Sequence, residues 1–309
     1  MKKYYMIKKW LKILLGKSDL HKEQSVGEYY SKEKIAGYYN DLRHKVNWSL
    51  GFDDKGIPLV QDSEGNKLYF TITIAQYGLG CYDKYLETKE KKYLDKFLII
   101  SDCLITTQDE LGGYDVSKSL GCKYSSMAQG EAISVLLRAY SKTNENKYFE
   151  KAKNAHTCMI RLVEDLGTQR IKNEDIYFEE YAIENKEATV LNGWIFSIFG
   201  LIDYSKIVQN KETEKLLELS IESLYKNLKY YDKNGWSYYS LDQKIASPFY
   251  HKLHINQLKV LNDLYPDFRC EQILKKWEKT EKIILIKLKM IIKKIIQKFK
   301  DPGEILIKN

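Results

Sequence analysis

Tyr181 and Tyr250 are the residues of this chain best placed for chemistry. Tyr181 closes the segment FEEY at 178–181, and Tyr250 opens the segment YHKLHINQL at 250–258, so both lie among polar groups that a core would not need. A phenol with a pKa of about 10 is a poor base in water, but beside a cation in a dry cleft it can take or give a proton. Two such phenols on opposite sides of one carbon atom could invert it. The alternative is a packing or capping role, because the chain holds 25 tyrosines.

Three polar neighbours of these tyrosines could share the chemistry. Glu180 precedes Tyr181 and could accept a proton or tune the phenol. His251 and His254 lie three residues apart, which would allow a metal pair, but no third ligand follows at a suggestive spacing, so we expect no metal. We favour a role in which the two histidines orient Tyr250 or contact a substrate.

The helical period dominates the chain from about residue 72 and predicts the elements that must position these residues. The expected helices cover 72–88, 92–108, 125–142, 146–164, 187–208, 211–229, 252–264 and 268–300. Short strands are expected within 27–70, and the polar, aromatic segments 111–124, 168–182 and 234–250 are expected to form hairpins over one end of the helices. Helix pairs with functional loops at one end indicate a mainly α fold, an incomplete (α/α) toroid with short β-hairpins; a generic helical bundle is the alternative.

Both ends of the chain are basic. Residues 1–18 hold six lysines and no acid, and residues 281–300 hold seven lysines against Glu281, whereas the net charge of the whole chain is +8. This distribution excludes a nucleic-acid groove through the domain and favours attachment of the termini to an anionic membrane surface. The five scattered cysteines, the lack of a signal peptide and the lack of a long apolar run predict a cytoplasmic protein, peripheral at the inner face of the membrane.

The predicted helix at 281–300 is amphipathic and basic. On a helical wheel one apolar face gathers Ile284, Leu288, Ile291, Ile292, Ile295 and Phe299, while Ile283, Ile286 and Met290 fall off it. The face could bind a membrane surface, or it could pack on the domain or on a second copy in a homodimer. We accordingly divide the chain into a basic lead at 1–26, a toroid at 27–270 and a basic C-terminal helix at 271–309.

Several further segments, taken together and in order, resemble the heparan sulfate/heparosan D-glucuronyl C5-epimerase family. The resemblance runs from roughly 37 to 265. Its matching stretches are 39–43 (YNDLR), 74–79 (IAQYGL), 101–102 with 108–113 (QDELGG), 126–130 (SMAQG), 179–181 (EEY), 190–193 (VLNG), 250–251 (YH) and 254–258 (HINQL).

The resemblance implies conversion of D-glucuronate to L-iduronate within an undersulfated acidic polysaccharide such as heparosan, with no organic cofactor. It implies catalytic roles for Tyr181, Tyr239, Tyr250 and Glu180. The substrate contacts that it implies are Arg43, His251, His254, Asn256, Asn192 and Gln129. Arg43 is the expected clamp for the substrate carboxylate, because a guanidinium matches a carboxylate bidentately; pairing with Asp41 is the alternative.

The chain departs from the family in three ways. It lacks the β-barrel insert that animal members carry between the 74–79 motif and Ser101, Ala182 stands where the family has proline, and Asp242 stands where it has arginine. The last change removes a cation that could hold a carboxylate or sulfate. Two other hypotheses therefore stand beside the epimerase: a lyase, which uses the same proton abstraction but expels the C4 substituent, and an acidic-glycan-binding module without catalysis.

Overall fold

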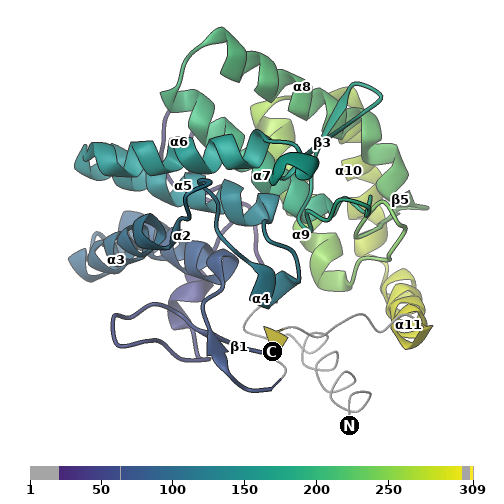
Figure 1. Cartoon of the computed structure of the whole chain (residues 1–309). Coiled ribbons are helices and arrows are strands. Elements are labelled where there is room, and N and C mark those ends of the chain that lie inside the picture. The colour runs from purple at the N-terminus through teal and green to yellow at the C-terminus, as the bar shows by residue number, and fades with distance from the viewer. Residues whose placement is uncertain (1–20, 63, 301–306, 309) are drawn as a thin grey trace.

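The computed structural model describes residues 21–62, 64–300 and 307–308. Long helices dominate it, and consecutive helices pack in pairs joined by short connections (Figure 1). The paired helices are α2 (Thr71–Thr88) with α3 (Lys91–Thr107), α5 (Ser126–Thr143) with α6 (Asn146–Ile160), α7 (Leu191–Ile207) with α8 (Lys211–Asn227), and α9 (Pro248–Leu264) with α10 (Phe268–Glu281). This is the predicted incomplete (α/α) toroid.

The first helix of each pair forms an inner layer, and the second covers it from outside. The inner helices α2, α5, α7 and α9 pack against one another in sequence order. Helix α7 (LNGWIFSIFGLIDYSKI) is apolar on nearly all sides and buried accordingly, whereas its partner α8 (KETEKLLELSIESLYKN) buries a single stripe. Gly130 lets α5 and α7 approach closely, because a Cβ at this position would lie 2.7 Å from the Phe196 carbonyl oxygen.

The connections before the inner helices α2, α7 and α9 carry short strands. The hairpin β3 (Gln169–Lys172) and β4 (Asp175–Phe178) precedes α7, and β5 (Asp232–Lys233) with β6 (Trp236–Ser237) precedes α9. Earlier in the chain, β1 (Val60–Asp62) pairs with β2 (Lys67–Leu68) and with β7 (Ile307–Lys308). The hairpin predicted at 111–124 is wrong, because this segment forms the short helix α4 (Ser117–Leu120), which ends at Gly121 in the left-handed region.

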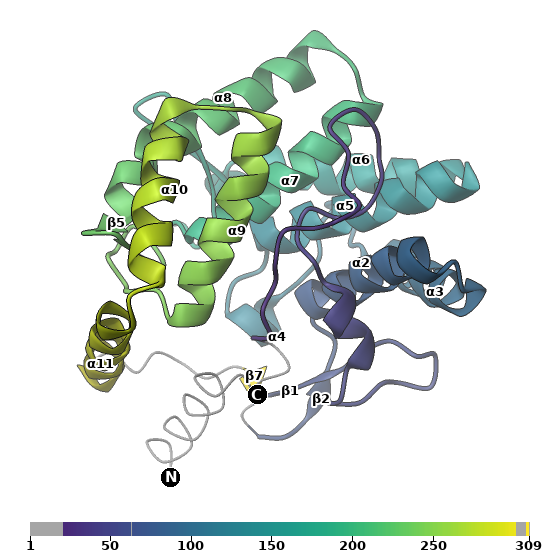
Figure 2. The ribbon, with the colours of Figure 1, turned by 180° about the vertical axis from the view of Figure 1, so that it is seen from behind.

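The segment from His21 to Leu42 fills the space between α9 and α2, where the ring of inner helices is open (Figure 2). The carbonyl of Gln24 accepts a hydrogen bond from Asn256 in α9, and the Tyr39 hydroxyl donates to Asp203 in α7. The Tyr38 amide then donates to Asp83 in α2. The segment from His21 to Leu42 thus completes the wall of the toroid between α9 and α2.

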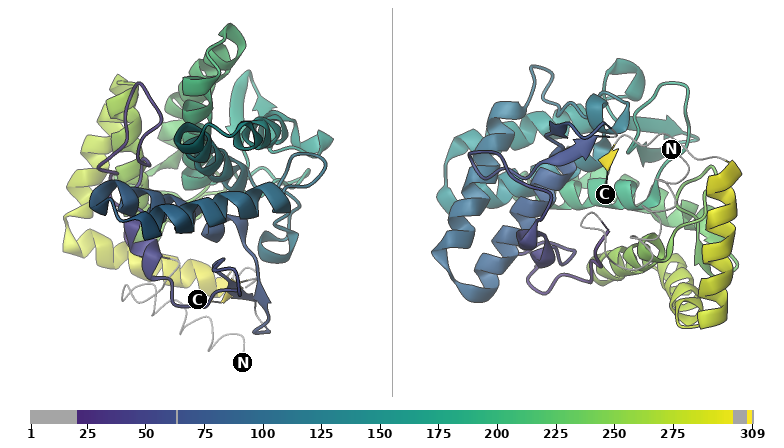
Figure 3. Two further views of the ribbon diagram at one scale, coloured as in Figure 1. Left: turned by 90° about the vertical axis from the view of Figure 1, so that its left-hand side faces the viewer. Right: turned by 90° about the horizontal axis from the view of Figure 1, so that it is seen from below.

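The single helix predicted at 268–300 is instead two helices. Helix α10 ends at Glu281 and α11 (Ile284–Lys300) follows after a break. The predicted division at 270/271 falls inside α10, which buries Cys270, Leu274 and Trp277 against the toroid. Helix α11 stands at the edge of the molecule (Figure 3). No helix in the described part of the chain is both long and apolar enough to cross a membrane.

Candidate active site

A cavity of about 570 Å³ lies at the amino-terminal ends of the inner helices. Its wall includes residues from the first turns of α2, α5, α7 and α9, together with the loops that precede them. Helix amino termini carry partial positive charge and unsatisfied N–H groups, so this end of the toroid favours an anionic ligand.

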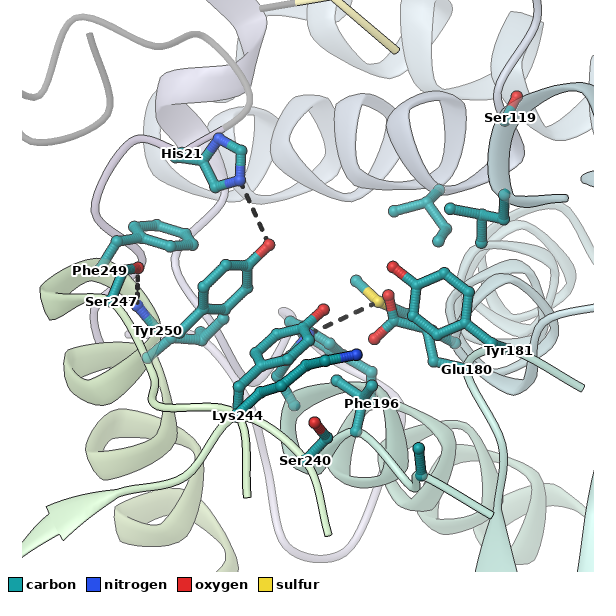
Figure 4. Close-up of a pocket in the computed structure, with 18 of the residues that line it drawn as sticks. His21, Ser119, Glu180, Tyr181, Phe196, Ser240, Lys244, Ser247, Phe249 and Tyr250 are labelled. Carbon is teal, nitrogen blue, oxygen red and sulfur yellow. Dashed lines mark hydrogen bonds between the residues drawn. The ribbon is translucent and has the colours of Figure 1, made fainter. Parts of the chain in front are cut away.

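Tyr181, Tyr239, Tyr250 and Glu180 all line this one cavity. Figure 4 shows Tyr181 and Tyr250 on opposite sides with both hydroxyls directed inward. Tyr239 neighbours both, since its ring centroid lies 4.7 Å from that of Tyr250 and its hydroxyl interacts with that of Tyr181. Residues separated by up to 70 positions in the chain therefore meet at one place.

Strand β4 runs into Glu179 and Glu180, and its alternation sends their side chains opposite ways. Glu179 accepts hydrogen bonds from Thr189 (2.8 Å) and Arg170 (3.3 Å) away from the cavity, which anchors the strand end. Glu180 faces the cavity and is 6% exposed. Gly193 at the start of α7 makes room for it, because a Cβ there would lie 2.6 Å from Oε2 of Glu180.

The other two phenols are fixed by the hairpin β5–β6 and by the start of α9. Tyr239 follows β6, and its carbonyl accepts a hydrogen bond from Leu191 in α7. Tyr250 lies in the first turn of α9, which begins at Pro248 with Ser247 as its N-cap, so the helix starts earlier than the predicted residue 252. The Ser247 hydroxyl accepts from the Tyr250 amide at 3.4 Å.

Burial sets the protonation state of this cluster. It raises the pKa of Glu180 to about 7, although the hydroxyls of Tyr181 and Tyr239 partly offset the rise. Burial, followed by the nearby charge of Glu180, raises the pKa of all three phenols above 10. The phenols are therefore proton donors near neutral pH, and the carboxyl group of Glu180 exchanges its proton most readily.

Four lysines also line the cavity: Lys186, Lys244, Lys294 and Lys298. Lys244 forms an ion pair with Asp242 (3.0 Å), and Lys186 lies 5.5 Å from the centroid of the Tyr181 ring. The cavity wall thus has more cations than the acids Glu180 and Asp242, so the aspartate in place of the family arginine does not leave it without positive charge.

Arg43 does not belong to this site, which corrects the prediction of a carboxylate clamp. Its guanidinium forms ion pairs with Asp41 (2.7 Å), Glu28 (2.6 Å) and Glu87 (2.6 Å), and it does not line the cavity. Three carboxylates already occupy its hydrogen-bonding fork. The alternative of a pairing with Asp41 is the one that the structure shows.

His251 and His254 lie behind the cavity wall rather than in it. The Nδ1 atoms of both rings contact the Ser237 hydroxyl, at 3.0 and 2.8 Å, and His251 stacks on Trp236 with centroids 3.9 Å apart. Burial lowers the pKa of His251 to about 3, so the ring is neutral. These contacts position β6, and hence the strand end that carries Tyr239, instead of contacting a substrate. Within residues 21–62, 64–300 and 307–308, no three His, Cys, Asp or Glu side chains gather as metal ligands.

The predicted amide contacts divide in the same way. Asn192 lines the cavity, where its amide faces Met127. Asn256 instead holds the carbonyl of Gln24, and Gln129 is fully buried in α5. Both are structural neighbours of the site and do not line it.

Sequence reasoning missed His21 and the lysines. Nε2 of His21 lies 3.2 Å from the Tyr250 hydroxyl, and the two rings meet edge to face. His21 and Lys294 come from the two ends of the chain, far from every recognised motif. Lys186, between the stretches 179–181 and 190–193, and Lys244, two residues after Asp242, stood close enough to recognised positions to be found.

The chain is similar to known proteins in sequence and in fold. The family model described as D-glucuronyl C5-epimerase C-terminus matches residues 108–279. A D-glucuronyl C5-epimerase of Caenorhabditis elegans is 27% identical over an alignment of 218 residues. The match covers 61% of this chain and 35% of that protein, so the chain spans about a third of that relative's length. The crystal structure of a sugar epimerase from a ruminal bacterium has the same fold, with a TM-score of 0.52 at 12% identity over 90% of this chain and 84% of that one.

The matched segment carries Glu180, Tyr181, Tyr239 and Tyr250, and it makes up more than half of the 309 residues. Arg43, His21 and α11 lie outside it. The chain belongs to the D-glucuronyl C5-epimerase family.

Proposed function

We propose that this protein inverts C5 of D-glucuronate to give L-iduronate within an undersulfated uronic-acid polysaccharide. Family membership supports the reaction type. The observation that carries the proposal is the convergence of Tyr181, Tyr239, Tyr250 and Glu180 on one cavity whose wall also holds four lysines. These groups are the acids, bases and cations that the reaction needs.

Inversion at C5 requires removal of the hydrogen next to the substrate carboxylate and return of a proton to the opposite face. Removing that hydrogen leaves an enolate that carries the charge of the carboxylate as well. Fixed positive charge around the carboxylate stabilises this dianion, and two positioned acid–base groups each contribute roughly 10²–10⁴-fold to the rate.

The four acid–base groups that line the cavity can carry the proton movements of the reaction. Glu180, with its pKa raised to about 7, accepts the proton of Tyr181, and the resulting phenolate removes the C5 hydrogen from one face of the ring. The C–H electron pair moves into the enolate. Tyr250 then donates its hydroxyl proton to the other face. Tyr239, which neighbours both phenols, passes a proton from Tyr181 to Tyr250. Glu180 then returns its proton to Tyr181, which restores the starting state.

The proposal predicts that incubation with heparosan yields iduronate residues in an intact polymer, detected by their NMR signals. A matched incubation with the Tyr181→Phe/Tyr250→Phe variant controls for chemical conversion. An unsaturated uronate chromophore with chain cleavage would instead identify a lyase. Binding of heparosan without any change in the sugar would identify a glycan-binding module, and either result would overturn the proposal.

We also propose that the outer face of α11 binds an anionic membrane surface. Most of the predicted apolar face is exposed: Ile284 is 74% exposed, Leu288, Ile292, Ile295 and Phe299 are exposed as well, and Ile291 is half-buried. The helix packs on the protein through Ile286 and Met290, which lie off that face. The exposed apolar stripe supplies side chains that can insert into a bilayer, and the lysines beside it supply attraction to anionic lipids.

Replacing Leu288, Ile292 and Phe299 together by glutamine is expected to lower binding to phosphatidylglycerol-containing vesicles by at least roughly tenfold, because each inserted side chain contributes about 1.5–3 kcal/mol when fully buried. Co-sedimentation measures this loss. The matched control replaces Leu166 and Ile171, two exposed apolar residues elsewhere, and should bind as the wild type does. The membrane assignment would be contradicted if the triple variant bound vesicles as well as the wild type does. It would also be contradicted if sedimentation showed that the substitutions convert a dimer into a monomer.

A further inference from the structure

Helix α11 has a second, inner stripe that faces the protein. Met290 packs with Trp236 and Ile245, and Ile286 lies against the same cluster. Further along the helix, the Gln297 side chain accepts a hydrogen bond from the Ile245 amide at 3.0 Å. Ile286, Met290, Lys294 and Gln297 follow one another at intervals of three or four residues, so they share one face of the helix.

Lys294 lies between Met290, which is fixed by packing, and Gln297, which is held by its hydrogen bond, and the Lys294 side chain is directed inward. It is 7% exposed and lines the cavity, with its Nζ 5.8 Å from the centroid of the Tyr239 ring. Its neighbours Lys289 and Lys293 on α11 are exposed. Lys298 of α11 also lines the cavity but is only half-buried, so Lys294 is the lysine of this helix that the fold buries beside Tyr239.

The position of Lys294 matches a requirement of the chemistry. The intermediate of C5 inversion carries negative charge on the substrate carboxylate. This group is attached to C5, from which Tyr181 removes the hydrogen and to which Tyr250 returns a proton. The family arginine near Tyr239 is Asp242 in this chain, and Arg43 is bound to three carboxylates away from the cavity. A partly desolvated ammonium beside Tyr239 interacts more strongly with a carboxylate than one in bulk water does.

We infer that Lys294, supplied by a helix outside the family match, binds the carboxylate of the uronate substrate and is a specificity-determining residue of the site. This inference rests on the proposed function. Helix α11 then has two roles: its inner stripe completes the substrate site, and its exposed outer face binds an anionic membrane surface.

The test compares binding of a heparosan oligosaccharide with binding of the same oligosaccharide after reduction of its carboxylates, by isothermal titration calorimetry. Lys294→Gln is expected to raise the Kd for heparosan by roughly 10- to 100-fold, as loss of a hydrogen bond to a charged group does, and to leave the Kd for the reduced ligand unchanged. Lys294→Arg should retain most of the affinity for heparosan. Lys289→Gln, a matched exposed lysine of α11, should bind both ligands as the wild type does.

Unchanged heparosan affinity in Lys294→Gln, or equal weakening for both ligands, would overturn the inference, because a merely structural role does not distinguish a carboxylate from an alcohol. Lys294→Met offers a second variant if the glutamine unfolds the helix. Failure of the proposed function is seen separately, as wild-type protein that binds heparosan but forms no iduronate. A wild type that binds neither ligand would overturn both.

Discussion

Replacing Tyr250 by phenylalanine is expected to lower kcat for C5 inversion by roughly 10²–10⁴-fold, with a much smaller effect on KM. The substitution removes one hydroxyl from the cavity and keeps the ring that packs against Tyr239 and Phe249. Binding of the polymer is therefore largely preserved, while the group that donates the proton is lost. Steady-state kinetics with heparosan, followed by NMR of iduronate formation, measures the effect.

Tyr238→Phe is the matched control for that experiment. Tyr238 adjoins Tyr239 in the chain, but its hydroxyl accepts a hydrogen bond from Lys233 (2.8 Å) and it does not line the cavity. This variant should keep the wild-type kcat. A Tyr250→Phe enzyme as active as Tyr238→Phe would remove Tyr250 from the mechanism.

Replacing Glu180 by glutamine is expected to act in opposite directions on activity and stability. The rate should fall by about 10²-fold or more, because the amide cannot accept the proton of Tyr181. The folded protein should become more stable at pH 8. Ionising a carboxyl group whose pKa is raised from 4.5 to about 7 costs the fold about 3 kcal/mol, and glutamine avoids this cost.

The sign of the stability effect depends on pH. Glu180 is protonated in both the folded and the unfolded protein well below pH 4.5, so it carries no penalty there. The penalty grows as pH rises from 4.5 to about 7, where only the unfolded protein has lost the proton, and it is constant above that range. Urea denaturation should therefore show Glu180→Gln more stable than the wild type at pH 8 and nearly equal to it at pH 4. A variant that is less stable at pH 8 would show that the carboxylate stabilises the fold instead.

The helical architecture could be predicted from the sequence because local periodicity fixes it. The apolar residues on nearly all sides of α7 and the one-sided stripe of α8 are patterns typical of an inner and an outer helix. The phenols could be found as well. Tyr181 and Tyr250 sit inside motifs whose order along the chain indicates the family, and Tyr239 followed from the resemblance to that family. Where propensity is weak, prediction failed: the segment 111–124 holds a short helix, and the boundary between α10 and α11 falls within a basic run that has no glycine or proline to mark it.

The cations of the site could not be predicted, because they depend on contacts between distant parts of the chain. Asp41 is the acid nearest to Arg43 in the sequence, but folding brings Glu28 and Glu87 to it as well. Lys294 is one of many lysines in a basic helical run, and only the docking of Met290 on Trp236 turns it toward the cavity. Similarly, the spacing of His251 and His254 would allow a metal pair, whereas in the structure both rings contact the Ser237 hydroxyl.

The central claim is that Tyr181 and Tyr250 act on opposite faces of one carbon, and the most direct test compares hydrogen exchange in D₂O by the two single phenylalanine variants. Each variant should still exchange the C5 hydrogen of one epimer, glucuronate or iduronate, and fail with the other, and the two variants should prefer opposite epimers. Mass spectrometry and NMR of both polymers locate the deuterium. If both variants exchange the same epimer, or if wild-type protein places no deuterium at C5 of any uronate polymer, the two phenols do not work as an opposed pair.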